Sequence, residues 1–256
     1  MNKKTRILVW LGVAVALGGA YLWFFGVSTG VCLETWYIGR KNPAVRRIPV
    51  ELRDLSLAPS TGRKIAINGY EFELPWNDVD EDRSKMIGNR RVIAFRSGNA
   101  ILVMFPTQNE FVNGVLKSGF DTETFRSIYG DGPLESDYAM YKLMLESAPQ
   151  RVSPLSSKKF AVGQAMMIVM KAISMPSGAE SGLYSVRSNG LNGFQYGDPD
   201  RRPKHITIDL LASDGGIEFG IFQKTEAAAQ TVTQPQINRM LYSIRRVGAG
   251  SSGTGD

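Results

Sequence analysis

Cysteine and histidine are almost missing from this sequence of 256 residues, which has one of each, Cys32 and His205. A single cysteine excludes an internal disulfide framework and a metal site made of several thiolates. A single histidine excludes two-histidine metal motifs and disfavours the usual catalytic triads. A Walker-type phosphate-binding loop, Gly-x-x-x-x-Gly-Lys-Ser/Thr, is missing as well. No local motif therefore commits the chain to a reaction.

Long runs of one charge are also missing, although the chain is basic, with a net charge of +6. The basic residues occur as scattered pairs, such as Arg90-Arg91 and Arg201-Arg202. A nucleic-acid-binding protein usually gathers its charge on one face or along one helix. We therefore expect no nucleic-acid partner, and we read the excess as surface charge that also favours an anionic lipid surface.

One long uncharged stretch, from Ile7 to Leu33, lies near the start of the sequence. Its most apolar part, Ile7–Phe25, has 19 residues. As a helix at about 1.5 Å per residue, that part spans the roughly 30 Å hydrocarbon core of a bilayer. The sequence therefore predicts one transmembrane helix over residues 7–27, with the lipid bilayer as its partner.

A cleaved signal peptide and a lipoprotein signal are the alternatives for this segment. A signal peptide has a shorter apolar region that ends in small residues, whereas this one ends in the bulky Trp23-Phe24-Phe25. A lipoprotein signal would place a small residue before Cys32, where Val31 stands. An uncleaved signal-anchor is therefore the favoured interpretation.

The basic residues beside this segment predict its orientation. Lys3, Lys4 and Arg6 precede it, and positive charge favours the cytoplasmic side. Arg40 and Lys41 on the other flank weaken the rule. We expect a single-pass protein of the cytoplasmic (inner) membrane, with its C-terminal domain outside the cytoplasm, in the periplasm.

The chain divides by composition into five expected segments. They are a cytoplasmic stub (1–6), the transmembrane helix (7–27), a stalk or linker rich in proline and glycine (28–63), a soluble α+β domain (64–247) and a disordered Gly/Ser tail (248–256).

Alternating apolar residues around turn sequences predict three hairpins. Their turns are Asn68-Gly69, Ser97–Asn99 and Ser213–Gly216, and further strands are expected at 182–187 and 193–196. Helices are predicted where capping residues precede apolar periodicity. They begin at Thr107, Asp121, Ser136, Ser157 and Thr233, and the third extends as far as Pro149. This order favours an α+β fold, an antiparallel sheet covered by helices and preceded by one transmembrane helix.

Two short strings carry a family resemblance. They are the strand Tyr70–Pro75 near the start of the domain and the ending Leu241-Tyr242-Ser243-Ile244-Arg245 of the last helix. This layout resembles the PsbP/Mog1-like superfamily, whose domains often finish in Ser-hydrophobic-Arg. The resemblance implies an accessory or binding protein, and it carries over no site residue. The helical insertion from 107 to 174 is larger than that superfamily leads us to expect.

Two loops contain candidate binding residues. Asp78, Asp80 and Asp82 have the opening spacing of a calcium loop, but Arg83 stands where the loop needs glycine. We therefore expect a solvated acidic loop there. The segment 197–203 packs charges of both signs and fits a linker between strands better than a recognition surface.

Methionines and the lone histidine are the other candidates. Met166 and Met170, with neighbours of the same type, fit core packing better than a copper site. His205 begins a predicted strand without a second ligand nearby in sequence, which favours a structural role. We accordingly assign no catalytic, cofactor-binding or metal residue and expect no cofactor.

Three functional hypotheses follow. The first is a non-catalytic membrane-anchored protein that binds a partner protein, lipid or envelope component. The alternative is a membrane-anchored hydrolase with an unrecognised carboxylate or serine site, which requires titratable groups to meet in a cleft. The third is a subunit of a larger membrane assembly that depends on the transmembrane segment itself.

Overall fold

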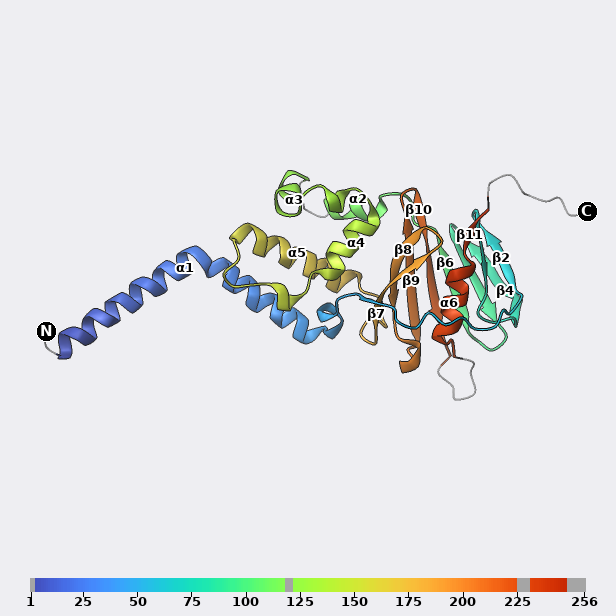
Figure 1. Ribbon diagram of the computed structural model, residues 1–256, viewed down its shortest axis with the longest axis horizontal. Helices are drawn as coiled ribbons and strands as arrows, with labels where there is room; N and C mark the ends of the chain where they lie inside the picture. Colours follow the sequence, from blue (N-terminus) through green and yellow to red (C-terminus); the bar gives the residue numbers. More distant parts are fainter. Residues whose placement is uncertain (1–2, 118–121, 225–230, 248–256) are drawn as a thin grey trace, which may run out of the picture.

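The computed structural model describes residues 3–117, 122–224 and 231–247, and it places side chains from residue 13 onward. The predicted tail (248–256) lies outside the described residues. One long helix, α1, extends away from a layered α+β domain, as Figure 1 shows. The predicted α+β class is therefore confirmed.

Six α-helices and four short 3-10 helices lie in the described part of the chain. The α-helices are α1 (Lys3–Lys41), α2 (Glu110–Lys117), α3 (Thr122–Tyr129), α4 (Asp137–Glu146), α5 (Lys158–Ser174) and α6 (Gln234–Ser243). The 3-10 helices are η1 (Pro43–Arg46), η2 (Gly132–Leu134), η3 (Pro149–Arg151) and η4 (Pro199–Arg201).

Eleven strands in the described residues form two sheets. They are β1 (Val50–Glu51), β2 (Lys64–Ile67), β3 (Tyr70–Glu73), β4 (Val79–Ile87), β5 (Arg90–Phe95), β6 (Ala100–Met104), β7 (Leu183–Ser188), β8 (Leu191–Tyr196), β9 (His205–Ala212), β10 (Gly215–Phe222) and β11 (Arg245–Arg246). The large sheet has the order β1-β7-β8-β9-β10-β6-β5-β4, and the small one β11-β3-β2.

The three predicted hairpins are confirmed as β2–β3, β5–β6 and β9–β10. One pair departs from the antiparallel expectation, because the two-residue strand β1 pairs with β7 in parallel. The third predicted helix was placed too long. Helix α4 ends at Glu146, since Ala148 is extended before Pro149, as residues that precede proline usually are.

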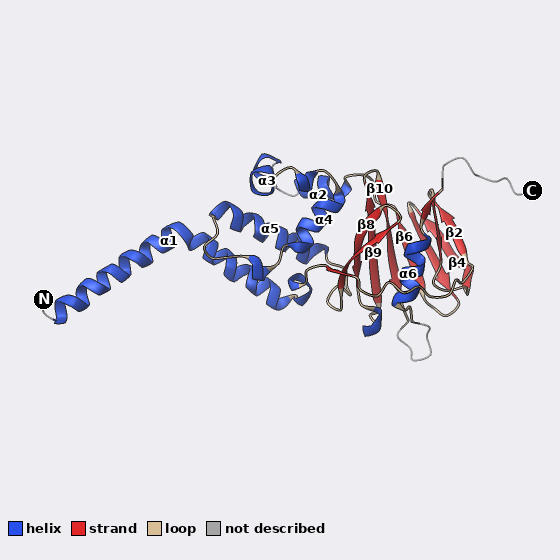
Figure 2. Ribbon diagram, viewed as in Figure 1, coloured by secondary structure: helices blue, strands red, loops and turns tan. Residues whose placement is uncertain are grey.

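The large sheet lies between two layers (Figures 1 and 2). Helices α2, α4 and the end of α5 lie against one face, with α3 packed on α5 farther from the sheet, while α6 and the small sheet cover the other face. Period-2 alternation assigns the side chains of β9 to these faces. Ile206, Ile208 and Leu210 belong to the core shared with α6, so Thr207 and Asp209 point toward the helical layer.

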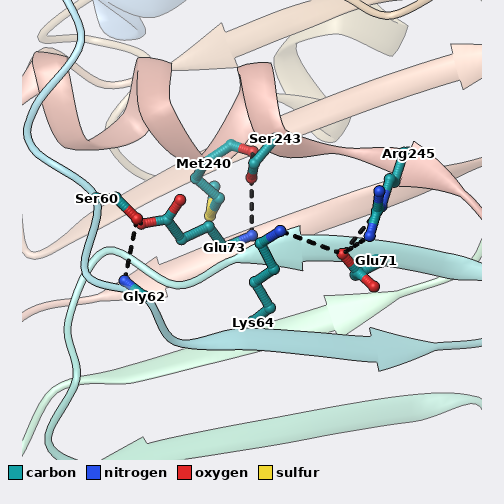
Figure 3. A network of polar contacts seen from close by, with 8 residues as sticks. All are labelled: Ser60, Gly62, Lys64, Glu71, Glu73, Met240, Ser243 and Arg245. Carbon is teal, nitrogen blue, oxygen red and sulfur yellow. Dashed lines mark hydrogen bonds and ion pairs between the residues drawn. The ribbon is translucent and has the colours of Figure 1, made fainter.

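A polar network fixes the small sheet to the end of α6 (Figure 3). The backbone N–H of Glu73 donates to Ser243 Oγ at 2.7 Å, and the Glu73 carboxylate accepts from Ser60 Oγ at 2.7 Å. Arg245 donates to Glu71 Oε1 through both Nε and Nη2. The Ser-hydrophobic-Arg ending of the last helix therefore has a structural role.

The segment predicted as a stalk, 28–63, begins as a continuation of α1. Residues up to Lys41 are helical and pack along α5, with Ser28 and Thr35 buried. Gly39 permits a close approach to η3, since a Cβ at this position would lie 2.8 Å from Pro149 Cγ. The assignment of 28–63 as a stalk stays a prediction, but its first third joins α1 directly to the helical layer.

Lys171 holds the same junction from inside. Its fully buried Nζ donates to Arg47 O at 2.5 Å, Leu145 O at 2.5 Å and Ser147 O at 3.0 Å. Two of these carbonyls lie at the C-terminal end of α4, where the helix dipole favours a cation. One side chain of α5 therefore links the end of α4 to the segment that follows α1.

Candidate functional site

A cavity of about 360 Å³ lies between the helical layer and the large sheet. Helix α2 contributes Glu110 and Phe111, and α4 contributes Asp137 and Tyr141. The floor comes from β9 and β10, and the remaining lining is mostly apolar. It consists of Pro106, Gly114, Val115, Met170, Leu211 and Ile217.

Two carboxyl side chains, those of Asp209 and Glu218, form the polar part of the floor. They are register partners across the β9–β10 ladder, so their side chains leave the same face of the sheet. Asp209 is 9% exposed, and Glu218 is half-buried. A hairpin has thus placed two acidic groups side by side under the helices.

Burial and mutual repulsion change how this pair titrates. Desolvation raises the pKa of Asp209 well above its ordinary value, and the charge of Glu218 raises it further. Desolvation also raises the pKa of Glu218, although Arg90 acts in the opposite direction. The pair therefore favours states in which at least one carboxyl keeps its proton, unless a positive charge enters the cavity.

Two tyrosines stand beside the pair. Tyr196, on the neighbouring strand β8, lies close enough to Asp209 for its hydroxyl to act to lower the pKa of that carboxyl, against the effect of burial. Tyr141 stacks on Phe111 with ring centroids 3.8 Å apart. Burial raises the pKa of both phenols, so each stays a neutral hydroxyl. The two aromatic rings of the stack give the cavity a wall that suits an apolar or cationic group.

The other two carboxylates of the cavity are held by the backbone. Asp137 Oδ1 accepts from Val112 N at 2.9 Å, and Glu110 Oε2 accepts from Thr107 N at 3.0 Å. Their negative charge still acts on the floor, since Glu110 raises the pKa of Glu218. They shape the cavity and its potential, whereas Asp209 and Glu218 are the groups free to meet a ligand.

Asp209 Oδ1 is the decisive atom of the site. It is buried and has no hydrogen-bond partner among the described residues. Leaving such an oxygen unpaired costs roughly 1–3 kcal/mol, so unpaired buried groups are rare and point to strain or function. Here the unpaired oxygen belongs to a residue that lines a cavity, so a ligand bound there could donate a hydrogen bond to it.

A larger cavity, of about 700 Å³, lies at the β1 edge of the sheet. Its walls include Leu52, Leu55, Tyr138, Lys142 and Asn238. Among the described residues, none of the buried side-chain atoms that lack a hydrogen bond belongs to its lining. The smaller cavity is therefore the better candidate for a specific ligand.

The residues singled out from sequence lie elsewhere. The acidic segment is not a solvated loop, because Asp80 and Asp82 belong to strand β4 and that prediction was wrong. Asp78 precedes the strand, and its Oδ2 accepts from Ser97 N at 2.9 Å. In the described part of the chain, no group of three or more His, Cys, Asp or Glu side chains is placed to hold a metal ion.

The other candidates have structural contacts. His205 stacks on Phe222 with centroids 4.4 Å apart, and burial lowers its pKa. The segment 197–203 contains η4, whose N-cap Asp198 accepts from Asp200 N. Met167 is fully buried in the core of the helical layer, while Met170 reaches the cavity wall.

Sequence reasoning missed the Asp209–Glu218 pair, although a signal was present. The turn at Ser213–Gly216 pairs Ala212 with Gly215, and counting outward from it brings residue 209 opposite 218. Two acidic residues that face each other across two largely apolar strands lower the stability of the fold, so their presence suggests a function. Register counting could have found the pair, but not the helices that enclose it.

Comparisons with known proteins return no match: no family model matches the sequence, and no curated protein or solved structure matches the chain. The resemblance to the PsbP/Mog1-like superfamily gains no support from them and stays a prediction.

Proposed function

We propose that this chain is a single-pass membrane protein whose α+β domain binds a small cationic ligand outside the cytoplasm. The anchor is supported by α1, which is long and apolar enough to span a membrane. Its large apolar side chains face outward beyond the domain, with Trp23 86% exposed and Leu17 66% exposed. Water is a poor solvent for so continuous an apolar surface, and lipid is a good one.

The binding role is supported above all by the unpaired Asp209 Oδ1 in the cavity. An ammonium group can donate a hydrogen bond to that oxygen. Its positive charge would also stabilise the ionised forms of Asp209 and Glu218, whose pKa values are raised in the free protein. The Phe111–Tyr141 stack offers a face for the cation or for its apolar body. A primary amine with a short apolar part therefore fits the cavity's chemistry and its volume.

The orientation rests on charge. Lys3, Lys4 and Arg6 precede the apolar part of α1, and positive residues favour the cytoplasmic side. This supports a location of the cavity in the periplasm. Resistance of the full-length chain to alkaline carbonate extraction tests the anchor. A reporter that is active only in the periplasm, fused after Asp256, tests on which side of the membrane the domain lies. Activity of a reporter that works only in the cytoplasm would contradict the proposed orientation.

Calorimetric titration of the detergent-extracted full-length chain tests the ligand class. We expect phenethylamine to bind, phenylethanol of the same shape not to bind, and Asp209→Asn to weaken the amine at least tenfold. Asp131→Asn, which removes an exposed carboxylate far from the cavity, is the matched control and leaves binding unchanged. Equal affinity of wild type and Asp209→Asn for butylamine, spermidine and phenethylamine would refute the proposal, as would binding of none of them.

A hydrolase is the second candidate, and one observation favours it. Asp209 and Glu218 are adjacent carboxyls with raised pKa values in a cavity, as acid–base catalysis requires. A catalyst would turn over an ester or glycoside with a rate that Asp209→Asn abolishes. A binding protein would release its amine chemically unchanged. Mass spectrometry of the small molecules that co-purify with the native protein distinguishes an intact amine from a hydrolysis product.

A further inference from the structure

The connection between η3 and α5 lies against the end of the apolar part of α1. Ser28 Oγ donates to Ser156 O at 2.7 Å, and Cys32 Sγ donates to Val152 O at 3.4 Å. In Figure 1 this connection and the start of α5 reach back along α1 toward its N-terminal half. Residues far apart in the sequence thus meet where α1 enters the domain.

The length of the uncharged stretch gives the depth of this contact. Residues 7–33 carry no charge and measure about 40 Å along the helix, more than the roughly 30 Å hydrocarbon core of a bilayer, and Figure 1 shows the helix axis change direction as it reaches the domain. Ser28 and Cys32 lie near the end of that stretch. If α1 spans the membrane, the segment 153–160 therefore lies at the level of the lipid headgroups.

The chemistry of the segment 153–160 suits that level. Leu155 is 62% exposed and Phe160 is 40% exposed, while Lys158 and Lys159 between them are exposed as well. The segment contains no acidic residue. Apolar side chains beside lysines are the pattern of surfaces that insert into the interface and attract anionic lipids.

We propose that the segment 153–160 is a second membrane contact, in which Leu155 and Phe160 enter the interface and Lys158 and Lys159 bind anionic headgroups. The proposal rests on the proposed anchoring of α1. Continuity with α1 is what selects lipid over a protein partner or a second copy of the chain as the occupant. Two contacts, the helix and this segment, would fix the tilt of the domain on the bilayer.

The single native cysteine makes this testable with the full-length chain. Cys32 is first replaced by serine, whose hydroxyl can still donate to Val152 O. In this background, Leu155→Cys provides the single thiol to which an environment-sensitive fluorophore is attached. Tyr242→Cys on α6, also highly exposed, serves as the matched control. Each protein is reconstituted into vesicles with and without phosphatidylglycerol, some containing a spin-labelled lipid that quenches at the headgroup level.

We expect a blue-shifted emission at position 155 and quenching by spin-labelled lipid several-fold stronger than at 242. Lys158→Glu with Lys159→Glu should remove most of the dependence on phosphatidylglycerol. An emission at 155 as water-exposed as that at 242 would overturn the proposal. A blue shift without lipid quenching would do so as well, because it indicates a protein contact. Carbonate extraction separates failure of the anchor from failure of this contact, since only the former releases the chain.

Discussion

Asp209 and Glu218 stand opposite each other on adjacent strands, on the one face of the sheet that the helices cover without filling. Cross-strand neighbours of like charge are destabilising, and burial makes the repulsion stronger. A pair that costs stability and lines a cavity is the pattern expected of a binding or catalytic site.

The first prediction concerns the stability of Asp209→Asn. Because the folded-state pKa of Asp209 is raised, its ionisation opposes folding. This loss of stability is absent below the unfolded pKa and grows as the pH rises toward the folded pKa. We expect the variant to be more stable than wild type at pH 8 by about 1–2 kcal/mol, or roughly 2–8 °C in melting temperature.

Thermal unfolding of the full-length chain in detergent, followed by tryptophan fluorescence at pH 4.5 and pH 8, measures this effect. The gain should shrink at the lower pH. Equal destabilisation by Asp209→Asn at pH 4.5 and pH 8 would contradict this prediction. It would show that the carboxyl stabilises the fold, and not that it lowers stability in exchange for a function.

The second prediction concerns the pH dependence of amine binding. A bound cation favours the ionised carboxylates, so binding should release protons from the Asp209–Glu218 pair. The affinity should therefore rise with pH while the amine stays protonated. Calorimetry in buffers of different ionisation enthalpy counts the protons, and a count near zero would argue against a cation at the pair.

The third prediction concerns Glu73. Burial acts to raise the pKa of this carboxylate, but hydrogen bonds from Ser60 and Thr61 outweigh it, and the net pKa is lowered. The resulting stability is present above the unfolded pKa and is lost as the pH falls through the folded pKa. Glu73→Gln should lower the melting temperature by about 3–6 °C at pH 7, which corresponds to roughly 1.5 kcal/mol.

The matched control lies on the same strand. Glu71 pairs with Arg245 and Lys64 near the surface, where an ion pair is worth roughly 0.5 kcal/mol, so Glu71→Gln should change the melting temperature little. A larger loss for Glu71→Gln than for Glu73→Gln would contradict the importance given to the Glu73 network.

The fourth prediction concerns Lys171. Replacing it by methionine leaves three backbone carbonyls unpaired and should cost about 3 kcal/mol. Burial lowers the pKa of Lys171 to about 7, whereas an unfolded lysine titrates near ~10.4. The unfolded chain binds more protons between these values, so the contribution of Lys171 rises with pH across that window.

Urea unfolding at pH 7 and pH 9.5 measures both parts of this prediction. Lys142→Met, which removes an exposed lysine from α4, is the control. A Lys171→Met variant as stable as this control would show that the three carbonyls find other donors.

Local chemistry made some elements predictable. The Asn68-Gly69 turn fixes the β2–β3 hairpin, and the Thr233 capping box fixes the start of α6, because each depends on residues close in sequence. Strand β4 was missed because it pairs on one side only. Its charged residues, such as Asp82 and Arg83, are typical of exposed edges and resemble a loop in sequence.

The candidate site was beyond such reasoning for a different reason. Asp209 and Glu218 are brought together by local register, but the cavity exists because α2 and α4, which lie about 60 to 110 residues earlier in the chain, pack over them. Whether a carboxylate faces water or an enclosed space is decided by tertiary packing. The sequence contains no marker for it.

Helix α1 passes without a break from its apolar part into the helical layer, where Gly39 and Lys171 fix its far end. Figure 1 shows the axis of α1 change direction between these two parts, although the helix itself is continuous. If α1 spans the membrane as proposed, a tilt that a thicker or thinner bilayer imposes on it is passed to the sheet through this continuous helix. On that proposal, lipid composition would set the direction in which the domain presents its cavity.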